Sequence, residues 1–390
     1  YTTLFRSISN IQAITQKVIQ AKDSLHGANK LAQNQEDSNS IINQSSNLND
    51  KQKQALNDLI NHAQTKQQVA EIIAQANKLN NEMGTLKTLV EEQSNVHQQS
   101  KYINEDPQVQ NIYNDSIQKG QEILNGTTDD VLNNNKIADA IQNIQLTKND
   151  LHGDQKLQKA QQDATNELNY LTNLNNSQRQ SEHDEINSAP SRTEVSNDLN
   201  HAKALNEVMR QLENEVALEN SVKKLSDFIN EDESAQNEYS TALQKAKDII
   251  NGVPTSTIDK ATIEGALLDL QNARESLHGE QKLQEAKNQA VAEIDNLQAL
   301  NPGQVLAEKT LVNQASTKPE VQEALQKAKE LNEAMKALKT EINKKEQIKA
   351  DSKYINADSG LQANYNSALN YGSQIITTTQ PPELDRKSVV

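Results

Sequence analysis

The chain has 390 residues, a formal net charge of −15, 34% hydrophobic and only 3% aromatic residues, and no cysteine. Large apolar side chains this scarce favour several slim units over one wide core, and the few Gly and Pro residues favour helices over sheets. The acidic charge argues against a protein that binds the phosphate backbone of nucleic acids. The lack of cysteine excludes disulfides and Cys-based zinc sites. No apolar run reaches the roughly 18 residues that a membrane-spanning helix needs.

The most informative pattern is a repeat of 126 residues. Met83, Met209 and Met335 lie at this interval, as do the motifs YIN at 102–104, FIN at 228–230 and YIN at 354–356. No insertion or deletion interrupts the period. It predicts the following organisation: the tail of a preceding copy at 1–27, a first copy at 28–153, a second copy at 154–279, an incomplete third copy at 280–378 and a tail at 379–390. Because the chain begins with Tyr1 and shows no signal peptide, we expect an excised fragment of a longer protein.

Each copy opens with helix signals in a fixed order. An Asn that suits a helix N-cap is followed by a Thr or Ser with Gln or Glu three residues later, which is a capping box. The N-cap columns are Asn49, Asn175 and Asn301, and the capping boxes are Thr65 with Gln68, Ser191 with Glu194 and Thr317 with Glu320.

A long helix follows the capping box. Apolar residues recur at steps of three and four from Val69 to Val90, then skip to Val96, and breakers are nearly absent over 66–102. This pattern predicts one helix of about 37 residues whose two halves serve different bundles.

Two more helices complete the copy. Asp106, Asp232 and Asp358 are predicted to cap the first of them, and the second carries Ile263, Leu267 and Leu270 before it ends at a Leu-His-Gly motif. Gly153 of this motif suits a helix C′ position or a tight bend.

The predicted fold is therefore an all-α rod of alternately connected three-helix bundles that share the long helix. The expected bundles are 28–90 with 91–153, 154–216 with 217–279, and 280–342 with a partial 343–378. The motif LHG followed by DQKLQ or EQKLQ, at 151–158 and 277–284, marks the seam at which one copy passes to the next.

Two stretches resemble known modules. The segment LNNSQRQSEHDEINSAPSRTEVSNDLNHAKALNEVMRQL at 174–212, with its counterparts at 48–86 and 300–338, resembles the GA module, a three-helix unit named for albumin-binding members. FINEDESAQNEYSTALQKAKDIINGVP at 228–254, with the closing LHG, resembles the FIVAR module. Their alternation resembles the Ebh family of giant staphylococcal extracellular-matrix-binding proteins, which has a fibronectin-binding relative. The resemblance implies a very long protein of the bacterial cell wall with fibronectin as its partner.

The two ends of the chain depart from this resemblance. YTTLFR at 1–6 and RKSVV at 386–390 do not match the corresponding positions of the copies, so we expect added residues or frayed ends there.

Candidate chemistry is sparse. His26, His152 and His278 recur at the seam, where a ligand or a pH sensor is one interpretation and a polar closure of a helix end is the favoured one. His183 in EHDE looks metal-like, but Asn57 and Lys309 replace it in the other copies. Carboxylate pairs such as those at 230–234 are expected on a solvated face. We predict no catalytic residue, no metal site, no cofactor and no enzyme.

The residues that the repeat maintains are predicted to be structural. The aromatic columns leave two interpretations open, packing of the second bundle or contact with a partner. The four columns are Leu79, Leu205 and Leu331; Met83, Met209 and Met335; Tyr113, Tyr239 and Tyr365; and Gly27, Gly153 and Gly279.

Three functions fit these observations. The first is an adhesin array that binds a matrix protein, fibronectin, weakly in each copy and gains avidity from many copies. Repeated polar positions such as Asn80, Asn206 and Asn332 motivate it. The second is a structural spacer or envelope scaffold without a ligand in this segment. The third, ranked lower, is albumin binding through the GA-like bundles. We expect a monomeric rod with no nucleic-acid partner, and the resemblance implies a place at the bacterial cell surface.

Overall fold

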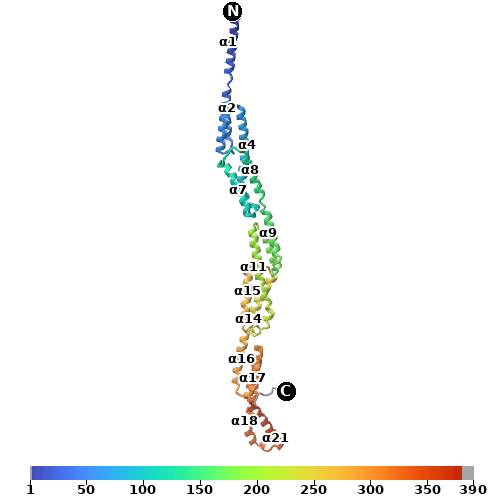
Figure 1. Cartoon of the computed structure of the whole chain (residues 1–390). Helices are drawn as coiled ribbons and strands as arrows, with labels where there is room; N and C mark the ends of the chain where they lie inside the picture. The colour runs from blue at the N-terminus through green and yellow to red at the C-terminus, as the bar shows by residue number, and fades with distance from the viewer. Residues whose placement is uncertain (1, 380–390) are drawn as a thin grey trace. The chain divides into compact units, whose positions relative to one another are not determined.

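The computed structural model describes residues 2–379, with side chains from residue 7, and every regular element in that range is an α-helix (Figure 1). The predicted tail at 379–390 and the RKSVV end lie almost wholly outside the described residues. The chain divides into two compact units, residues 1–167 with 184–199 and residues 168–183 with 200–390, and each is described by itself.

The helices recur in the same order in each copy. After α1 (Thr2–Asp23), the first copy contains α2 (Gly27–Gln44), α3 (Asp50–His62), α4 (Lys66–Glu91), α5 (Gln93–His97), α6 (Ser100–Ile103), α7 (Pro107–Leu124) and α8 (Asn134–Asn149). The second contains α9 (Gly153–Leu168), α10 (Asn176–Ser188), α11 (Arg192–Ala217), α12 (Glu219–Val222), α13 (Ser226–Ile229), α14 (Glu233–Asn251) and α15 (Lys260–Glu275). The third contains α16 (Gly279–Asp295), α17 (Pro302–Gln314), α18 (Lys318–Asn343), α19 (Lys345–Ala350), α20 (Ser352–Ile355) and α21 (Ser359–Thr377).

The predicted N-terminal caps form where the sequence placed them. Asn49 and Thr65 each take part in a complete capping box, with Gln52 and Gln68, and Asn301 and Thr317 do so in the third copy. In the second copy, the side chain of Asn175 accepts from the backbone N–H of Gln178, and Ser191 from that of Glu194. These side chains satisfy donors that the first helical turn leaves unpaired.

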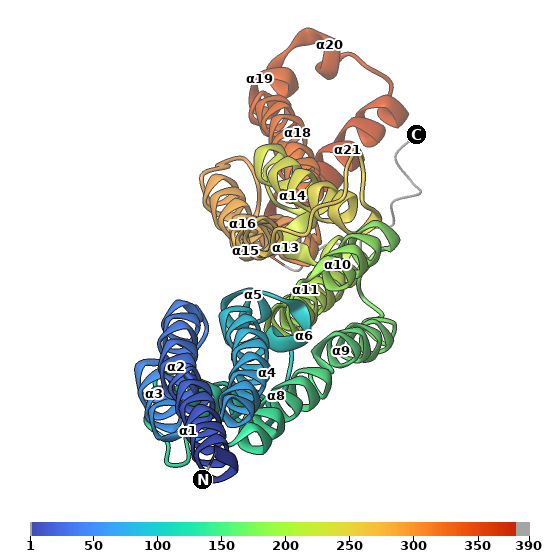
Figure 2. The ribbon, with the colours of Figure 1, turned by 90° about the horizontal axis from the view of Figure 1, so that it is seen from above.

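Helix α4 belongs to two bundles, as the sequence predicted. It packs against α2 and α3 and also against α7 and α8 (Figures 1 and 2). One continuous core joins the two bundles, running from Val69 and Met83 on α4 to Tyr113 on α7 and Ile144 on α8. In the third copy α18 likewise packs against α16, α17 and α21. The all-α fold, the 126-residue repeat and the shared helix are thus confirmed.

The prediction of one uninterrupted helix over 66–102 is wrong. Helix α4 ends at Glu91, and the amide groups of Gln98 and Gln99 bond only three residues back before Gln99 becomes extended. In a continuous helix, residues five apart point about 140° away from each other. The break instead lets the ring of Tyr102 stack on that of His97, with 4.2 Å between centroids. The same interruption divides α11 from α12 and α13, and α18 from α19 and α20.

Glutamates occupy a core position of the GA-like bundle in two copies. Leu56 is fully buried in the first copy, whereas Glu182 and Glu308 hold its column and are 0% and 5% exposed. Both carboxylates have partners, and the side chain of Glu182 lies 2.9 Å from Nδ1 of His201. A buried carboxylate loses hydration that its partners must replace.

Among residues 2–379, no helix combines the length and the apolar character that crossing a bilayer requires.

We predict that Leu205→Ala lowers the free energy of unfolding by about 2–5 kcal/mol, because it leaves a cavity in the core. Leu205 on α11 is fully buried. Urea unfolding followed by circular dichroism measures the loss. The control is Asn214→Ala on the exposed face of the same helix, which should stay within about 0.5 kcal/mol of the unchanged chain. Equal losses in the two variants would contradict the assignment of this face to the core.

A second prediction is that Glu308→Leu is neutral or stabilises the third copy by up to about 4 kcal/mol, since a leucine already fills this column in the first copy. The same urea titration measures it, with the exposed Glu330→Leu as control. Destabilisation of the Glu308 variant would show that the bonds of the buried carboxylate outweigh its desolvation.

Candidate functional site: the polar joints of the repeat

The apolar columns singled out from the sequence lie in the cores. Leu79, Leu205, Met83 and Met209 are 0% exposed, Met335 is 3% exposed and Leu331 is half-buried. The aromatic columns pack the second bundle of each copy: Tyr102 meets Tyr113, Phe228 meets Tyr239 and Tyr354 meets Tyr365, edge to face at 6.1, 5.9 and 5.8 Å between centroids. Tyr113 and Tyr239 are at most 1% exposed, whereas Tyr365 is half-buried. Burial raises the pKa of Tyr113 to about 12.

The repeated polar residues are occupied by structural hydrogen bonds. The side-chain oxygens of Asn80, Asn206 and Asn332 accept from the backbone N–H of Asn47, Asn173 and Ala299, at 3.0, 2.9 and 3.0 Å. Each bond fixes the turn between the first two helices of a copy to the long helix. These columns therefore repeat for a structural reason, and they no longer motivate a ligand-binding face.

A second set of polar residues joins the two bundles within a copy; we call it the internal junction (Asn49 and Gln52, with the corresponding residues of the other copies). Asn49 Nδ2 donates to the carbonyl of Ile123 at 3.2 Å, and Gln52 Nε2 donates to that of Val131 at 2.9 Å. Equivalent bonds link Asn175 to Ile249, Gln178 to Thr257 and Asn301 to Ile375. Residues that cap the second helix of the GA-like bundle thereby also hold the end of the FIVAR-like bundle.

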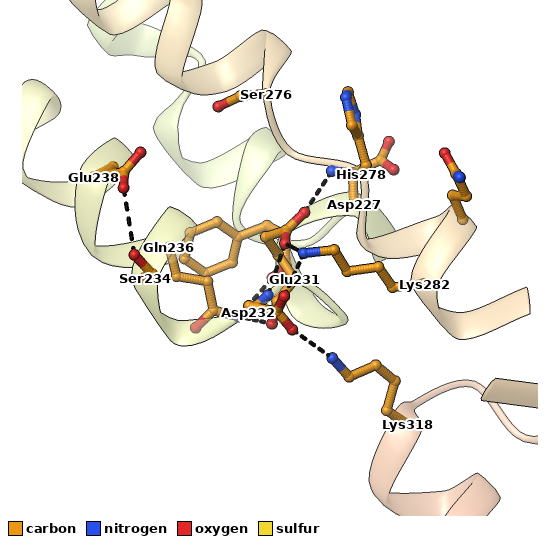
Figure 3. Close-up of polar contacts among 12 residues, drawn as sticks. Asp227, Glu231, Asp232, Ser234, Gln236, Glu238, Ser276, His278, Lys282 and Lys318 are labelled. Carbon is orange, nitrogen blue, oxygen red and sulfur yellow. Dashed lines mark hydrogen bonds and ion pairs between the residues drawn. The ribbon is translucent and has the colours of Figure 1, made fainter. Parts of the chain in front are cut away.

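The seam consists of three chain segments in each unit. In the second unit they are residues 226–232, 277–282 and 316–318, and in the first unit residues 100–106, 151–156 and 190–192. Figure 3 shows the second seam, where Glu231 on the turn after α13 converges with His278 and Lys282 at the start of α16 and with Lys318 at the start of α18.

Glycine at the seam permits a close approach of two backbones. A Cβ on Gly279 would lie 2.5 Å from the carbonyl oxygen of Ser226 and 2.6 Å from the nitrogen of Glu231. A Cβ on Gly153 would lie 2.5 Å from the carbonyl oxygen of Lys101. Both glycines begin a helix, α16 and α9, so the interpretation of Gly153 as a C′ residue is wrong. Gly27, in the same column, is exposed and has no described atom within 4 Å of its Cβ position.

The carboxylate of Glu231 is the most buried charge of the seam, with its side chain 1% exposed. It accepts from the backbone N–H of His278 at 2.6 Å and from that of Asp232 at 2.8 Å, and it forms an ion pair with Lys282. Glu105 makes the same three contacts in the first seam, with His152, Asp106 and Lys156. Charge-assisted bonds of this kind compensate for the desolvation of a carboxylate.

The neighbours of this glutamate bind the third segment. Asn230 Nδ2 donates to the carbonyl of Ser316 at 3.1 Å, and its Oδ1 accepts from the N–H of Lys318 at 2.9 Å. Asp232 pairs with Lys282 at 2.5 Å and with Lys318 at 3.0 Å. In the first seam, Asp106 pairs with Lys156 and Arg192 in the same way.

Electrostatics favour the ionised form of both carboxylates. Burial by itself raises the pKa of Glu231, but the hydrogen bonds from Lys282 and from the backbone of Asp232 and His278 outweigh it and leave that pKa below the ordinary value of 4.5. Hydrogen bonds from Lys282 and Lys318 lower the pKa of Asp232. Glu105 and Asp106 shift in the same direction for the same reasons.

Sequence reasoning located the seam but missed its chemistry. Asp106 stands at the N-cap of α7, as predicted, but its side chain makes no capping bond and instead forms ion pairs. His152 contributes its backbone N–H to Glu105, while its ring lies against the carbonyl of Asp150. A sequence signal for these ion pairs does exist. Lys156 and Lys282 each lie three residues after a Leu-His-Gly motif, and an acidic pair, Glu105 with Asp106 or Glu231 with Asp232, stands at a fixed distance before each of them.

We predict that Gly279→Ala destabilises the chain by about 1–3 kcal/mol, because the new methyl group would overlap backbone atoms. Gly27→Ala is the matched control, since it also begins a helix and meets open space; it should cost nothing and can gain up to about 1 kcal/mol. Thermal unfolding by circular dichroism measures both. A Gly279 variant as stable as the Gly27 variant would refute the close approach.

Two known family models match this chain in alternation. The model of the GA module matches residues 28–82, 154–208 and 280–334. The model of the FIVAR domain matches residues 82–152, 208–278 and 334–390. The matched ranges alternate and recur with the same 126-residue period as the helices.

Similar proteins come from Staphylococcus aureus. Extracellular matrix-binding protein EbhA of strain N315 is 39% identical over 97% of this chain, which spans 6% of that protein. Extracellular matrix-binding protein ebh of strain JH9 is 39% identical over the same share, and the chain spans 4% of it. A crystal structure of a domain of S. aureus EbhA covers 63% of this chain and 98% of its own length, with a TM-score of 0.60 and 26% identity.

The order of the helices, the polar joints and the alternating family models agree along the chain. The chain belongs to the family of repeat proteins built from alternating GA modules and FIVAR domains.

Proposed function

We propose that this chain is a non-enzymatic segment of a bacterial cell-surface adhesin. It binds an extracellular-matrix protein, fibronectin, with low affinity in each copy, and many copies in one protein supply avidity. The observation that carries the proposal is the 39% identity over 97% of the chain to proteins named for matrix binding. The chain spans only 4–6% of those proteins, so their activity as a whole is part of the proposal.

A binding face that serves avidity should repeat with the copies. The buried columns and the polar joints are engaged within the fold, which leaves exposed columns as candidates. One such column is apolar in every copy: Ile103, Ile229 and Ile355 are 50%, 48% and 59% exposed. We assign this isoleucine column to the contact with the matrix protein, since exposed apolar residues that recur at an interval favour a repeated partner contact.

A structural spacer is the second candidate, and the joints favour it. Internal junctions and seams fasten each bundle to the next with hydrogen bonds and ion pairs, which suits a segment whose role is reach across a cell envelope. This candidate predicts an extended, monomeric particle in small-angle scattering and no ligand. Albumin binding through the GA modules ranks below both, because GA modules can keep their core without a ligand face.

Binding is tested by biolayer interferometry of the whole chain against immobilised fibronectin, with albumin in parallel. We expect saturable, weak binding to fibronectin and a lower affinity for a chain that lacks residues 154–279, because avidity falls with copy number. The absence of binding to both fibronectin and albumin would favour the structural spacer.

The isoleucine column is tested in the same assay. Replacing Ile103, Ile229 and Ile355 together by Ser should abolish fibronectin binding. The control replaces three exposed leucines that do not recur as an exposed column, Leu59, Leu268 and Leu306, by Ser. Equal effects of the two triple variants would reject the column as the contact while leaving the binding proposal in place.

A further inference from the structure

The seam depends on a single buried carboxylate in each unit. At the second seam, Glu231 lies on the turn between α13 and α14 and binds the first turn of α16 through the N–H of His278 and through Lys282. The first seam repeats this arrangement with Glu105, His152 and Lys156. The same geometry at both seams indicates that the carboxylate is part of the joint.

We propose that Glu231 and Lys282, and likewise Glu105 and Lys156, form a charge latch that keeps the joint between consecutive copies stiff at neutral pH and releases it in acid. With the carboxylate ionised, the latch holds the first helix of the next copy against the preceding FIVAR domain. When the carboxylate is protonated, the ion pair with the lysine is lost. One oxygen lone pair of the carboxyl group then carries the proton and no longer accepts a hydrogen bond, so the joint bends.

In the third copy, the turn that corresponds to this position forms without the carboxylate. Ala357 stands in the column of Glu105 and Glu231. Helices α20 and α21 nevertheless form around it, and Gln362 Nε2 donates to the carbonyl of Tyr354 at 2.7 Å, just as Gln236 does to Phe228 at 2.6 Å. Alanine in this column is therefore compatible with the local fold, and the glutamate serves the joint.

The direction of the pH response follows from the charges that meet at the seam. Since the pKa of Glu231 is lowered in the folded chain, its stabilisation is complete above the ordinary value of 4.5 and is lost as the pH falls through the lowered pKa. The pKa of Lys282 is raised mainly by hydrogen bonds to Asp232 and Glu231, so its contribution is lost only in strong alkali. The charged or titratable groups around the latch are Asp232 on its own segment, Asp227 on α13, His278 and Glu280 at the start of α16, and Lys318 on α18.

Bending of the joint can be measured by pulsed electron–electron double resonance on the whole chain. The chain has no cysteine, so Thr241→Cys on α14 and Gln289→Cys on α16 place two spin labels at unique, exposed sites on the two sides of the second seam. The readout is the width of the label-to-label distance distribution at about pH 7 and at the acid end of a titration that runs below the lowered pKa of Glu231. Circular dichroism at both values monitors helix content.

The test variant is Glu231→Ala, and its matched control is Glu233→Ala, which removes the same charge from an exposed site two residues along. We expect a narrow distribution for the unchanged chain and the control at neutral pH. We expect broadening for Glu231→Ala at neutral pH and for the unchanged chain in acid, at unchanged helix content. The variant should also lose most of the further broadening in acid.

Two results would overturn the latch. One is a Glu231→Ala distribution as narrow as that of the control at neutral pH, and the other is a control distribution as broad as that of the variant. Either result would mean that the joint owes its stiffness to other contacts.

Discussion

The helix that belongs to two bundles is the constraint on which the rest of the structure depends. Because α4 places Val69 in one bundle and Val90 in the next, neither bundle can move without carrying the helix with it. A capping box fixes the start of the helix at Thr65, and beyond its end at Glu91 the chain becomes extended at Gln99, before α6. In the first copy the two slim bundles share one core, which suits a chain so poor in large apolar residues.

Polar residues that recur in such an array do not by themselves indicate a ligand. Asn80, Asn49 and Glu105 each bind a segment far away in the sequence, and each bond fixes a turn or a helix end to another element. Backbone groups at helix ends need partners in any case, and here a neighbouring module supplies them. The same chemistry that completes a helix therefore also joins modules, and the faces that bind other molecules must be sought among exposed columns such as that of Ile103.

Most of the fold could be predicted from the sequence because its signals are local. These signals join residues three or four apart, as in the caps at Asn49 and Thr65 and the apolar stripe through Leu79 and Met83. Because the repeat shows each signal in three copies, each could be checked against the others. The break before Ser100 could not be predicted, since no Gly or Pro marks it and the recurring contact beyond it, Tyr102 with Tyr113, joins two separate helices. The seam was located by its motif, but Glu105 is one acidic residue among many, and its partner Lys156 lies 51 residues away.

The period of 126 residues also governs how the array can change in length. The Leu-His-Gly motifs at 151–153 and 277–279 are each preceded by the glutamate of a seam and followed by its lysine, in the same register. If residues 154–279 were lost by recombination between two copies, Gly153 would be followed by Glu280, and Lys282 would face Glu105 as Lys156 does. Lys318 would likewise replace Arg192 opposite Asp106. A gene that loses this copy thus encodes no mismatched joint, so the shorter array is able to fold.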